Sequence, residues 1–142
     1  MTPSPHAERG RRDGPPRTGE EKNVLTRLLR QERAVAALAR RALAGAEVRA
    51  FTGEVVATVA RVLEVEYCHV LELTPEGDAL LLTAGAGWEE GLIGHATVEA
   101  GDHTLAGHTL SSAQPVIVDD LTSETPFSAS PLLPESGITS VI

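Results

Sequence analysis

The spacing of apolar residues divides the chain into two helical segments followed by a region of strands and turns. Between residues 21 and 43 the spacing alternates between four and three, at Val24, Leu28, Gln31, Val35, Leu38 and Ala42. This pattern predicts an amphipathic helix whose apolar seam fits a heptad repeat, with arginines along the flanks. Gly45 suits the left-handed position that follows a helix C-terminus, so we expect the helix to end just before it.

A second amphipathic helix is predicted after residue 46. One of its faces carries Phe51, Val55, Val59, Ala60 and Leu63. We expect this face to lie against a sheet, with hydrophobic burial as the main force that holds the helix there.

Two runs rich in apolar and β-branched residues, 65–73 and 79–88, flank a turn that contains Pro75 and Gly77. Proline presets φ at one turn position and glycine supplies a positive φ at another, so the pattern predicts a β-hairpin. Cys68 lies within the first run. A free cysteine in such a run usually behaves as a small hydrophobic side chain, and we expect it to be buried.

The rest of the chain alternates loops with short regular segments. Residues 94–101 read as a loop bracketed by glycines, and Thr104 suits the N-cap of a short helix. Residues 115–121 predict an apolar strand. After a further loop, residues 132–136 have room for one or two helical turns, and residues 137–142 begin another strand.

Three motifs in this order resemble those of GAF sensor domains. They are the loop Gly87-Trp88-Glu-Glu-Gly91-Leu-Ile-Gly94, the short helix Leu105-Ala106-Gly107-His108-Thr109-Leu110, and the strand from Pro115 to Leu121. The resemblance covers residues 46–142 and implies an α+β fold in which helices flank an antiparallel sheet. In the family two further strands and a closing helix would follow, so we expect an incomplete domain with an open sheet edge.

The chain is therefore expected to have three parts. Residues 1–20 mix prolines and glycines with charges and have no apolar period, which predicts a disordered tail. Residues 21–45 form a signalling helix of coiled-coil type. Residues 46–142 form the partial GAF domain.

Charge is unevenly distributed along the sequence. The net charge is −8, yet all 12 Lys and Arg lie at or before Arg61, and 13 of the 20 Asp and Glu lie in residues 62–142. A nucleic-acid site needs clustered cations, so none is expected in the C-terminal region. No apolar run approaches the roughly 20 residues of a membrane helix, and the start lacks a secretory signal, so we expect a cytoplasmic protein without membrane contact.

The sequence offers little catalytic chemistry. A single cysteine excludes an intramolecular disulfide and a multi-cysteine zinc site, and it argues against the GAF-type methionine sulfoxide reductases. The pair Cys68-His69 resembles the bilin attachment pair of phytochrome-type GAF domains, but it lies in the first strand and not after it. Asp119 and Asp120 read as a solvated strand end. A small hydrolase using one of them with His108 is a third, weaker hypothesis.

The resemblance implies a non-catalytic sensory domain that binds a small ligand. The expected pocket residues are Trp88, Leu92, Ile93, His95, Leu105 and His108. A pocket without Lys or Arg should favour neutral, planar or cationic ligands over phosphorylated ones. The cofactor is unknown. Some GAF domains bind haem through one histidine, and His95 or His108 would be the candidate here.

The resemblance also implies that the signal leaves through a homodimer. The first helix is expected to pair with its copy through Leu28, Val35 and Leu38. The output module would be a histidine kinase, as in two-component systems, or a cyclic-di-GMP enzyme, outside this chain. An alternative of a different class is a ligand-free dimerisation or scaffold domain.

Overall fold

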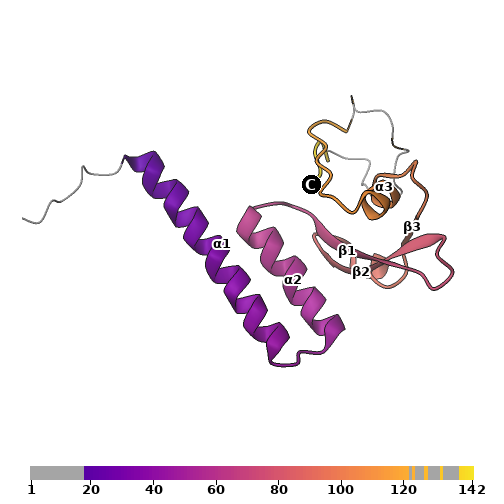
Figure 1. Cartoon of the computed structure of the whole chain (residues 1–142), viewed down its shortest axis with the longest axis horizontal. Coiled ribbons are helices and arrows are strands. Elements are labelled where there is room, and N and C mark those ends of the chain that lie inside the picture. Colours follow the sequence, from indigo (N-terminus) through magenta and orange to yellow (C-terminus); the bar gives the residue numbers. More distant parts are fainter. Residues whose placement is uncertain (1–17, 122, 124–126, 128–131, 133–137) are drawn as a thin grey trace, which may run out of the picture.

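The computed structural model describes residues 18–121, 123, 127, 132 and 138–142. The elements are two long helices, α1 (Gly19–Leu43) and α2 (Val48–Leu63), then the strands β1 (Cys68–Leu73) and β2 (Ala79–Ala86), the short 3₁₀ helix η1 (Glu90–Leu92), the strand β3 (Thr97–Glu99) and the helix α3 (Leu105–Ser112). The strands form one antiparallel sheet in the order β1-β2-β3. In Figure 1, α1 is outermost, α2 lies between α1 and the sheet, and α3 lies above the sheet next to β3.

The predicted first helix forms, with a capping box at its N-terminus that was not predicted and the expected glycine after its C-terminus. At the N-terminus Thr18 and Glu21 make a capping box: the Glu21 N–H donates to the Thr18 hydroxyl (3.4 Å), and the Thr18 N–H donates to the Glu21 carboxylate (3.0 Å). The helix thus begins two residues earlier than the apolar pattern indicates. Beyond its C-terminus Gly45 adopts φ +75°, the left-handed conformation predicted for it. The predicted tail falls, from residue 1 to residue 17, outside the described residues.

Helix α1 rests on α2 through one face. Gln31, Ala34 and Leu38, spaced by three and four, are half-buried where the two helices pack, and no residue of α1 is fully buried. Two exposed ion pairs join the helices, from Arg41 to Glu54 (3.0 and 2.6 Å) and from Arg30 to Glu64 (3.1 Å). Because Glu64 directly follows α2, residues 19–29 extend beyond the end of that helix, as Figure 1 shows.

Helix α2 buries more than the predicted face. Phe51, Val55 and Val59 are half-buried as expected, but Leu63 is 47% exposed, and the buried residues are Val56 and Val62. The single-face prediction is therefore only partly correct. The reason is the position of α2: it packs on β1 and β2 on one side and on α1 on the other, so two faces are covered.

The predicted hairpin forms. The register runs from Cys68 opposite Ala86 to Leu73 opposite Leu80, and Gly77 adopts φ +80° in the turn. A bulge between Val70 and Leu71 was not predicted, because an extra residue leaves no mark in a short apolar run. The prediction that Cys68 is buried is wrong: it is half-buried, since it opens the strand beside a cavity.

Two segments differ from the expected pattern. The stretch predicted as a loop contains β3, which pairs with β2 from Ala79 opposite Glu99 to Leu81 opposite Thr97. Three residues are too few for an alternating pattern to stand out. Conversely, residues 115–121 form no extended strand. Only one antiparallel bridge occurs there, in which Val118 and Val141 exchange two backbone hydrogen bonds (2.8 and 2.9 Å).

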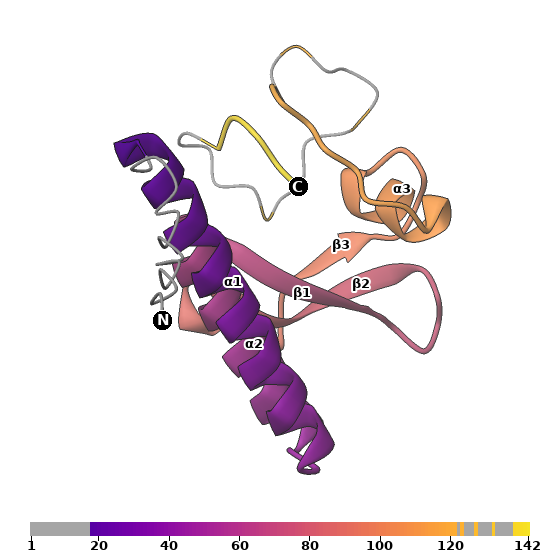
Figure 2. The same cartoon turned by 60° about the vertical axis from the view of Figure 1, so that its left-hand side comes forward.

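The core lies on the sheet beside α3. Leu82, Val98 and Leu132 form a buried cluster, and Leu132 joins it from outside the regular elements. The half-buried side chains that pack against this cluster are Leu71, Trp88, Leu92, Ile93, Ala96 and Ala106. Of the predicted helical turns at 132–136, only Leu132 is among the described residues. Figure 2 shows the same arrangement from a second direction, with the C-terminal residues above the sheet.

Candidate functional site

A cavity of about 780 Å³ lies beside β1. Its walls are β1 and the three residues before it, the C-terminal end of α2, helix α3, and the two segments 115–119 and 138–142. A volume of this size falls within the range of small-molecule sites, which is roughly 300–1,000 Å³. Most of its lining side chains are apolar, among them Leu71, Val98 and Leu105. The cavity is therefore the candidate ligand site.

Three aromatic rings meet at one wall of the cavity. The ring of Trp88 lies 5.3 Å from Tyr67 at an interplanar angle of 60°, and 5.3 Å from His69 at 82°, nearly edge to face. Tyr67, directly before β1, and His69, within it, are two residues apart in extended chain, so both side chains emerge on the face where Trp88 lies. Pairs of this geometry attract each other beyond their buried area.

Glycine positions the indole of Trp88. A Cβ placed on Gly85 would lie 2.7 Å from the Trp88 Cδ1 atom, so the ring rests directly on the Gly85 backbone. Gly87 adopts φ +81°, and a Cβ there would overlap the carbonyl oxygen of Glu66. The indole N–H of Trp88 is buried and has no hydrogen-bond partner among the described residues. Such a group typically costs about 1–3 kcal/mol.

The environment of β1 suppresses charge on two titratable groups. Desolvation raises the pKa of the Cys68 thiol, which outweighs the opposing effect of the His69 backbone N–H. Desolvation also lowers the pKa of His69, although part of its surface remains exposed. At neutral pH the thiol is protonated and the imidazole is uncharged, so Cys68 lacks the thiolate that a nucleophile needs.

The only acidic side chains in the described lining are those of Glu66 and Asp119, and this lining contains no Lys or Arg. Both side chains are exposed at the rim, and neither forms an ion pair within the described part of the chain. With His69 neutral, the cavity is apolar inside and negative at its edge. This agrees with the charge distribution along the sequence.

The six residues predicted for the pocket lie in different places. Trp88 and Leu105 line the cavity. Leu92 and Ile93 pack against the core cluster instead, and His95 is exposed near them. These three, together with His108, are not among the lining residues.

His108 lies on α3 with its ring 5.3 Å from Phe127. The described residues include no hydrogen bond between His108 and Asp119, the pair considered for a hydrolase. Nor do they include a group of three His, Cys, Asp or Glu side chains that could hold a metal ion.

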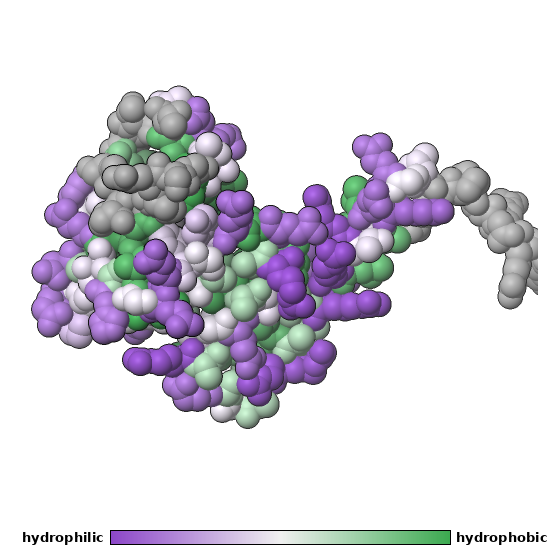
Figure 3. All heavy atoms as spheres, turned by 180° about the vertical axis from the view of Figure 1, so that it is seen from behind, coloured by the Kyte–Doolittle hydropathy of each residue, from purple (hydrophilic) through white to green (hydrophobic). Residues whose placement is uncertain are grey.

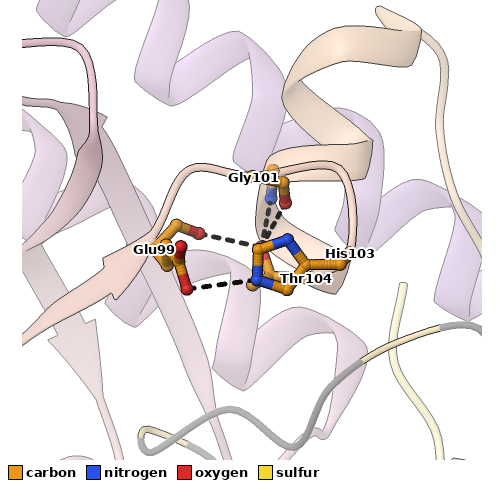
Figure 4. A network of polar contacts seen from close by, with 5 residues as sticks. Glu99, Gly101, His103 and Thr104 are labelled. Atoms are coloured by element: carbon orange, nitrogen blue, oxygen red, sulfur yellow. Dashed lines mark hydrogen bonds and ion pairs between the residues drawn. The ribbon is translucent and has the colours of Figure 1, made fainter.

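The N-terminus of α3 is fixed by the network in Figure 4. Thr104, which is buried, accepts a hydrogen bond from the Gly107 N–H (3.0 Å) and donates to the Glu99 carbonyl (2.8 Å), so the predicted N-cap is confirmed. His103 contacts the Glu99 carboxylate (3.1 Å). A Cβ on Gly107 would overlap the carbonyl oxygens of Ala100 and Gly101. This close contact holds α3 against the end of β3 and so fixes one wall of the cavity.

Sequence reasoning missed Tyr67, His69, Glu66 and Asp119 as lining residues. Tyr67 and His69 carry a signal, since two rings with polar atoms stand two residues apart in the first predicted strand, before the loop that contains Trp88. Asp119 carries none, because its place depends on the bridge between Val118 and Val141.

Comparison with known proteins identifies the fold. The profile of the GAF domain family matches residues 47–142. The chain therefore belongs to the GAF domain family. Its GAF domain starts one residue before α2, so α1 precedes the matched region. A comparison with curated protein sequences finds no match.

Two solved GAF domains are similar in structure. One is the GAF domain from an Acinetobacter phosphoenolpyruvate-protein phosphotransferase, with a TM-score of 0.65 and 19% identity over 78% of this chain and 64% of that chain. The other comes from a phosphoenolpyruvate-protein phosphotransferase of Coxiella burnetii, with a TM-score of 0.64 and 14% identity over 72% of this chain and 61% of that chain. At these identities the likeness shows the fold alone.

The GAF chain spans less than two thirds of the length of either matched structure. The expected α+β architecture, an antiparallel sheet with flanking helices and a long helix before it, is confirmed, and the sheet of the described residues has three strands. Among the described residues, no helix combines the length and the apolar character needed to cross a membrane.

Proposed function

We propose that this GAF domain is a non-catalytic regulatory module that binds a small ligand in the cavity beside β1. The observation that carries the proposal is the cavity itself: it has the volume of a small-molecule site and a mainly apolar lining, with few polar groups around it. The raised pKa of Cys68 gives no support to a catalytic role for its thiol. A cytoplasmic location is part of the proposal.

The contacts of the α2 terminus support a path from the cavity to α1. Val59 and Leu63 of α2 line the cavity, as do the residues that follow Glu64. The Glu64 carboxylate itself contacts Arg30 of α1. A ligand that shifts the start of β1 would therefore act on the junction that α1 touches. We propose that this junction transmits occupancy to the helix.

The surface of α1 supports a homodimer as the route of output. Leu28 is 52% exposed and Val35 is 67% exposed, on the side of the helix that α2 leaves open. Figure 3 shows apolar side chains among polar ones on the projecting part of α1. Leu38, also proposed for the dimer, is half-buried in the packing of α1 on α2. We therefore assign the contact mainly to Leu28 and Val35, and to Leu38 at its margin.

The nature of the output module is a finer question. Histidine kinases and cyclic-di-GMP enzymes are the outputs that the sequence suggests, but neither matched structure comes from such a protein. Both are GAF domains of phosphoenolpyruvate-protein phosphotransferases. An output of phosphotransferase type therefore joins the candidates.

A ligand-free dimerisation domain is the second candidate function, and the exposed apolar side chains of α1 favour it. Haem binding gains no support, since His95 and His108 are absent from the described lining. The two main candidates make different predictions for the cavity, whereas both predict a dimer.

The test uses ligand binding in the purified chain. We expect native mass spectrometry to detect a retained small molecule, or a screen that follows Trp88 fluorescence to find a saturable ligand. Thr109→Phe, which fills the cavity from an exposed position on α3, should abolish binding. Ser111→Phe, exposed on α3 outside the lining, should leave it intact. A dimer with neither a retained molecule nor a ligand would favour the dimerisation domain.

A further inference from the structure

We propose that the cavity recognises an organic cation, through the aromatic faces of Tyr67 and Trp88 and the carboxylates of Glu66 and Asp119. This inference rests on the proposed function, because it names the class of ligand for the same cavity. It commits to a molecule that carries its positive charge on an apolar framework, such as a quaternary or alkylated ammonium group.

The charge of the lining is the first argument. The negative charges of Glu66 and Asp119 are not compensated within the described lining. No Lys or Arg occurs there, and neither carboxylate has an ion-pair partner among the described residues. The one imidazole in the described lining is that of His69, whose lowered pKa keeps it uncharged at neutral pH. The lining therefore attracts cations. A phosphate or carboxylate ligand would meet repulsion at the rim and no cationic side chain inside.

The aromatic wall is the second argument. Tyr67 and Trp88 both line the cavity, and their rings are tilted by 60° to each other, so their faces are not stacked together. A cation held over such faces is attracted by the ring quadrupole, and the attraction grows when water is excluded. The Trp88 ring packs against the backbone of Gly85, so little conformational entropy of this side chain is lost when a ligand binds.

The apolar remainder of the wall is the third argument, because it separates organic from inorganic cations. A metal ion needs several oxygen, nitrogen or sulfur ligands that converge, and no such group occurs in the described part of the chain. The wall formed by Leu71, Val98 and Leu105 is instead apolar and favours contact with hydrocarbon groups of a ligand. An alkylated ammonium group satisfies both requirements, since its methyl groups spread the charge and desolvate easily.

The test compares two probes of the same shape. Choline and 3,3-dimethyl-1-butanol are nearly isosteric, but the first carries a quaternary nitrogen where the second has a carbon atom. Each is titrated into the full chain while Trp88 fluorescence is followed, with cyclic AMP as the anionic probe. We expect choline to bind roughly tenfold more tightly than the neutral alcohol, and cyclic AMP to be the weakest of the three.

Neutralised carboxylates give the second arm. Asp119→Asn and Glu66→Gln should each reduce the preference for choline over the alcohol while leaving the affinity for the alcohol unchanged. Glu76→Gln is the matched control, because Glu76 lies in the exposed hairpin turn outside the lining. It should preserve the full preference. A loss of preference in all three variants would mean that general surface charge, and not this site, selects the cation.

The outcomes distinguish failure of the cation assignment from failure of the proposed ligand-binding function. Equal binding of choline and the alcohol, or tightest binding of cyclic AMP, overturns the cation assignment but leaves a ligand-binding domain. Failure of all three probes also overturns it. In that case the test with Thr109→Phe decides separately whether the cavity binds anything. A retained molecule or a screening ligand that binds the wild type and not this variant would show that it does.

Discussion

The helical N-terminal region and the sheet region of this GAF chain differ in how far they bury their side chains. Helix α1 contains no buried residue and contacts the rest of the chain through one face. Strand β2 instead alternates between buried and half-buried residues, with Leu82 fully enclosed. The sheet region thus contains its own core, whereas α1 presents apolar side chains that its own chain does not cover. We therefore expect most of the folding stability to come from the sheet region, and a partner to bind at α1.

Charge follows the same division. Every Lys and Arg lies at or before Arg61, and the sheet region carries most of the acidic residues. The cations of α1 serve its contacts with α2, as at Arg30 and Arg41, while the cavity in the sheet region faces two unpaired carboxylates. Substitutions of one type in the two regions should therefore have unequal effects.

The largest expected difference comes from the same substitution made in each region. Leu82→Ala removes a side chain with 0% exposure from the core cluster and should destabilise the chain by about 2–5 kcal/mol. Leu43→Ala, at a position with 88% exposure on α1, should change stability by less than about 0.5 kcal/mol. Urea denaturation measures both. Comparable losses would contradict the division.

The dimer prediction concerns α1 alone. Burial of Leu28 and Val35 between two copies should contribute about 1 kcal/mol or more for each side chain. Leu28→Glu combined with Val35→Glu should therefore convert a dimer to a monomer in analytical ultracentrifugation, with the fold retained.

The matched control for the dimer is Arg33→Ala combined with Arg40→Ala, at exposed positions of the same helix. It changes the net charge by −2, as the double Glu variant does, but removes no apolar side chain. The control should remain dimeric. A wild-type chain that stays monomeric at high concentration would rule out the contact.

A smaller effect is expected at the contact between α3 and β3. Gly107→Ala places a Cβ against the carbonyl oxygens of Ala100 and Gly101, which are backbone atoms and cannot move aside freely. A loss of about 1–3 kcal/mol is expected, together with weaker ligand binding, because α3 forms a wall of the cavity. Gly91→Ala has open space around the new methyl group and is the control. Equal melting temperatures for the two variants would show that α3 is free to shift.

The smallest expected effect is at the exposed ion pair between α1 and α2. Hydrogen bonding to Arg41 lowers the pKa of Glu54 from its ordinary value of 4.5. A lowered pKa in the folded state means that the stabilisation is present above pH 4.5 and is lost as the pH falls below it. Glu54→Gln should therefore lower the melting temperature slightly at pH 7 and not at pH 3. A difference that persists at pH 3 would point to packing instead of charge.

Much of the fold could be predicted because its signals are local. The N-cap at Thr104, the left-handed Gly45 and the turn glycine Gly77 each act within a few residues, and the structure contains all three. The missed features depend on contacts between distant segments. Strand β3 pairs with β2, and α2 buries residues on more than one face because it packs on both α1 and the sheet.

The cavity shows the same limit more strongly. Trp88 and Leu105 could be predicted from the resemblance, since the motif places them at the loop and the helix. Leu92 and Ile93 have the same apolar character, yet they pack on Leu82 and its neighbours, and composition cannot distinguish a lining side chain from a core one. Asp119 could not be foreseen at all, because a bridge to residue 141 brings it to the rim.

The overhang of α1 gives the molecule a lever arm. Among the described residues, the ion pair between Arg30 and Glu64 joins α1 to the end of α2, and α1 continues from there back to Gly19. Eleven residues of α-helix span roughly 16 Å at about 1.5 Å per residue. A tilt of α1 by about 10° at this ion pair would move the N-terminus of the helix by roughly 3 Å, which is more than half of the helical pitch of about 5.4 Å. In the proposed dimer, such a displacement would change which side chains meet across the two copies of α1.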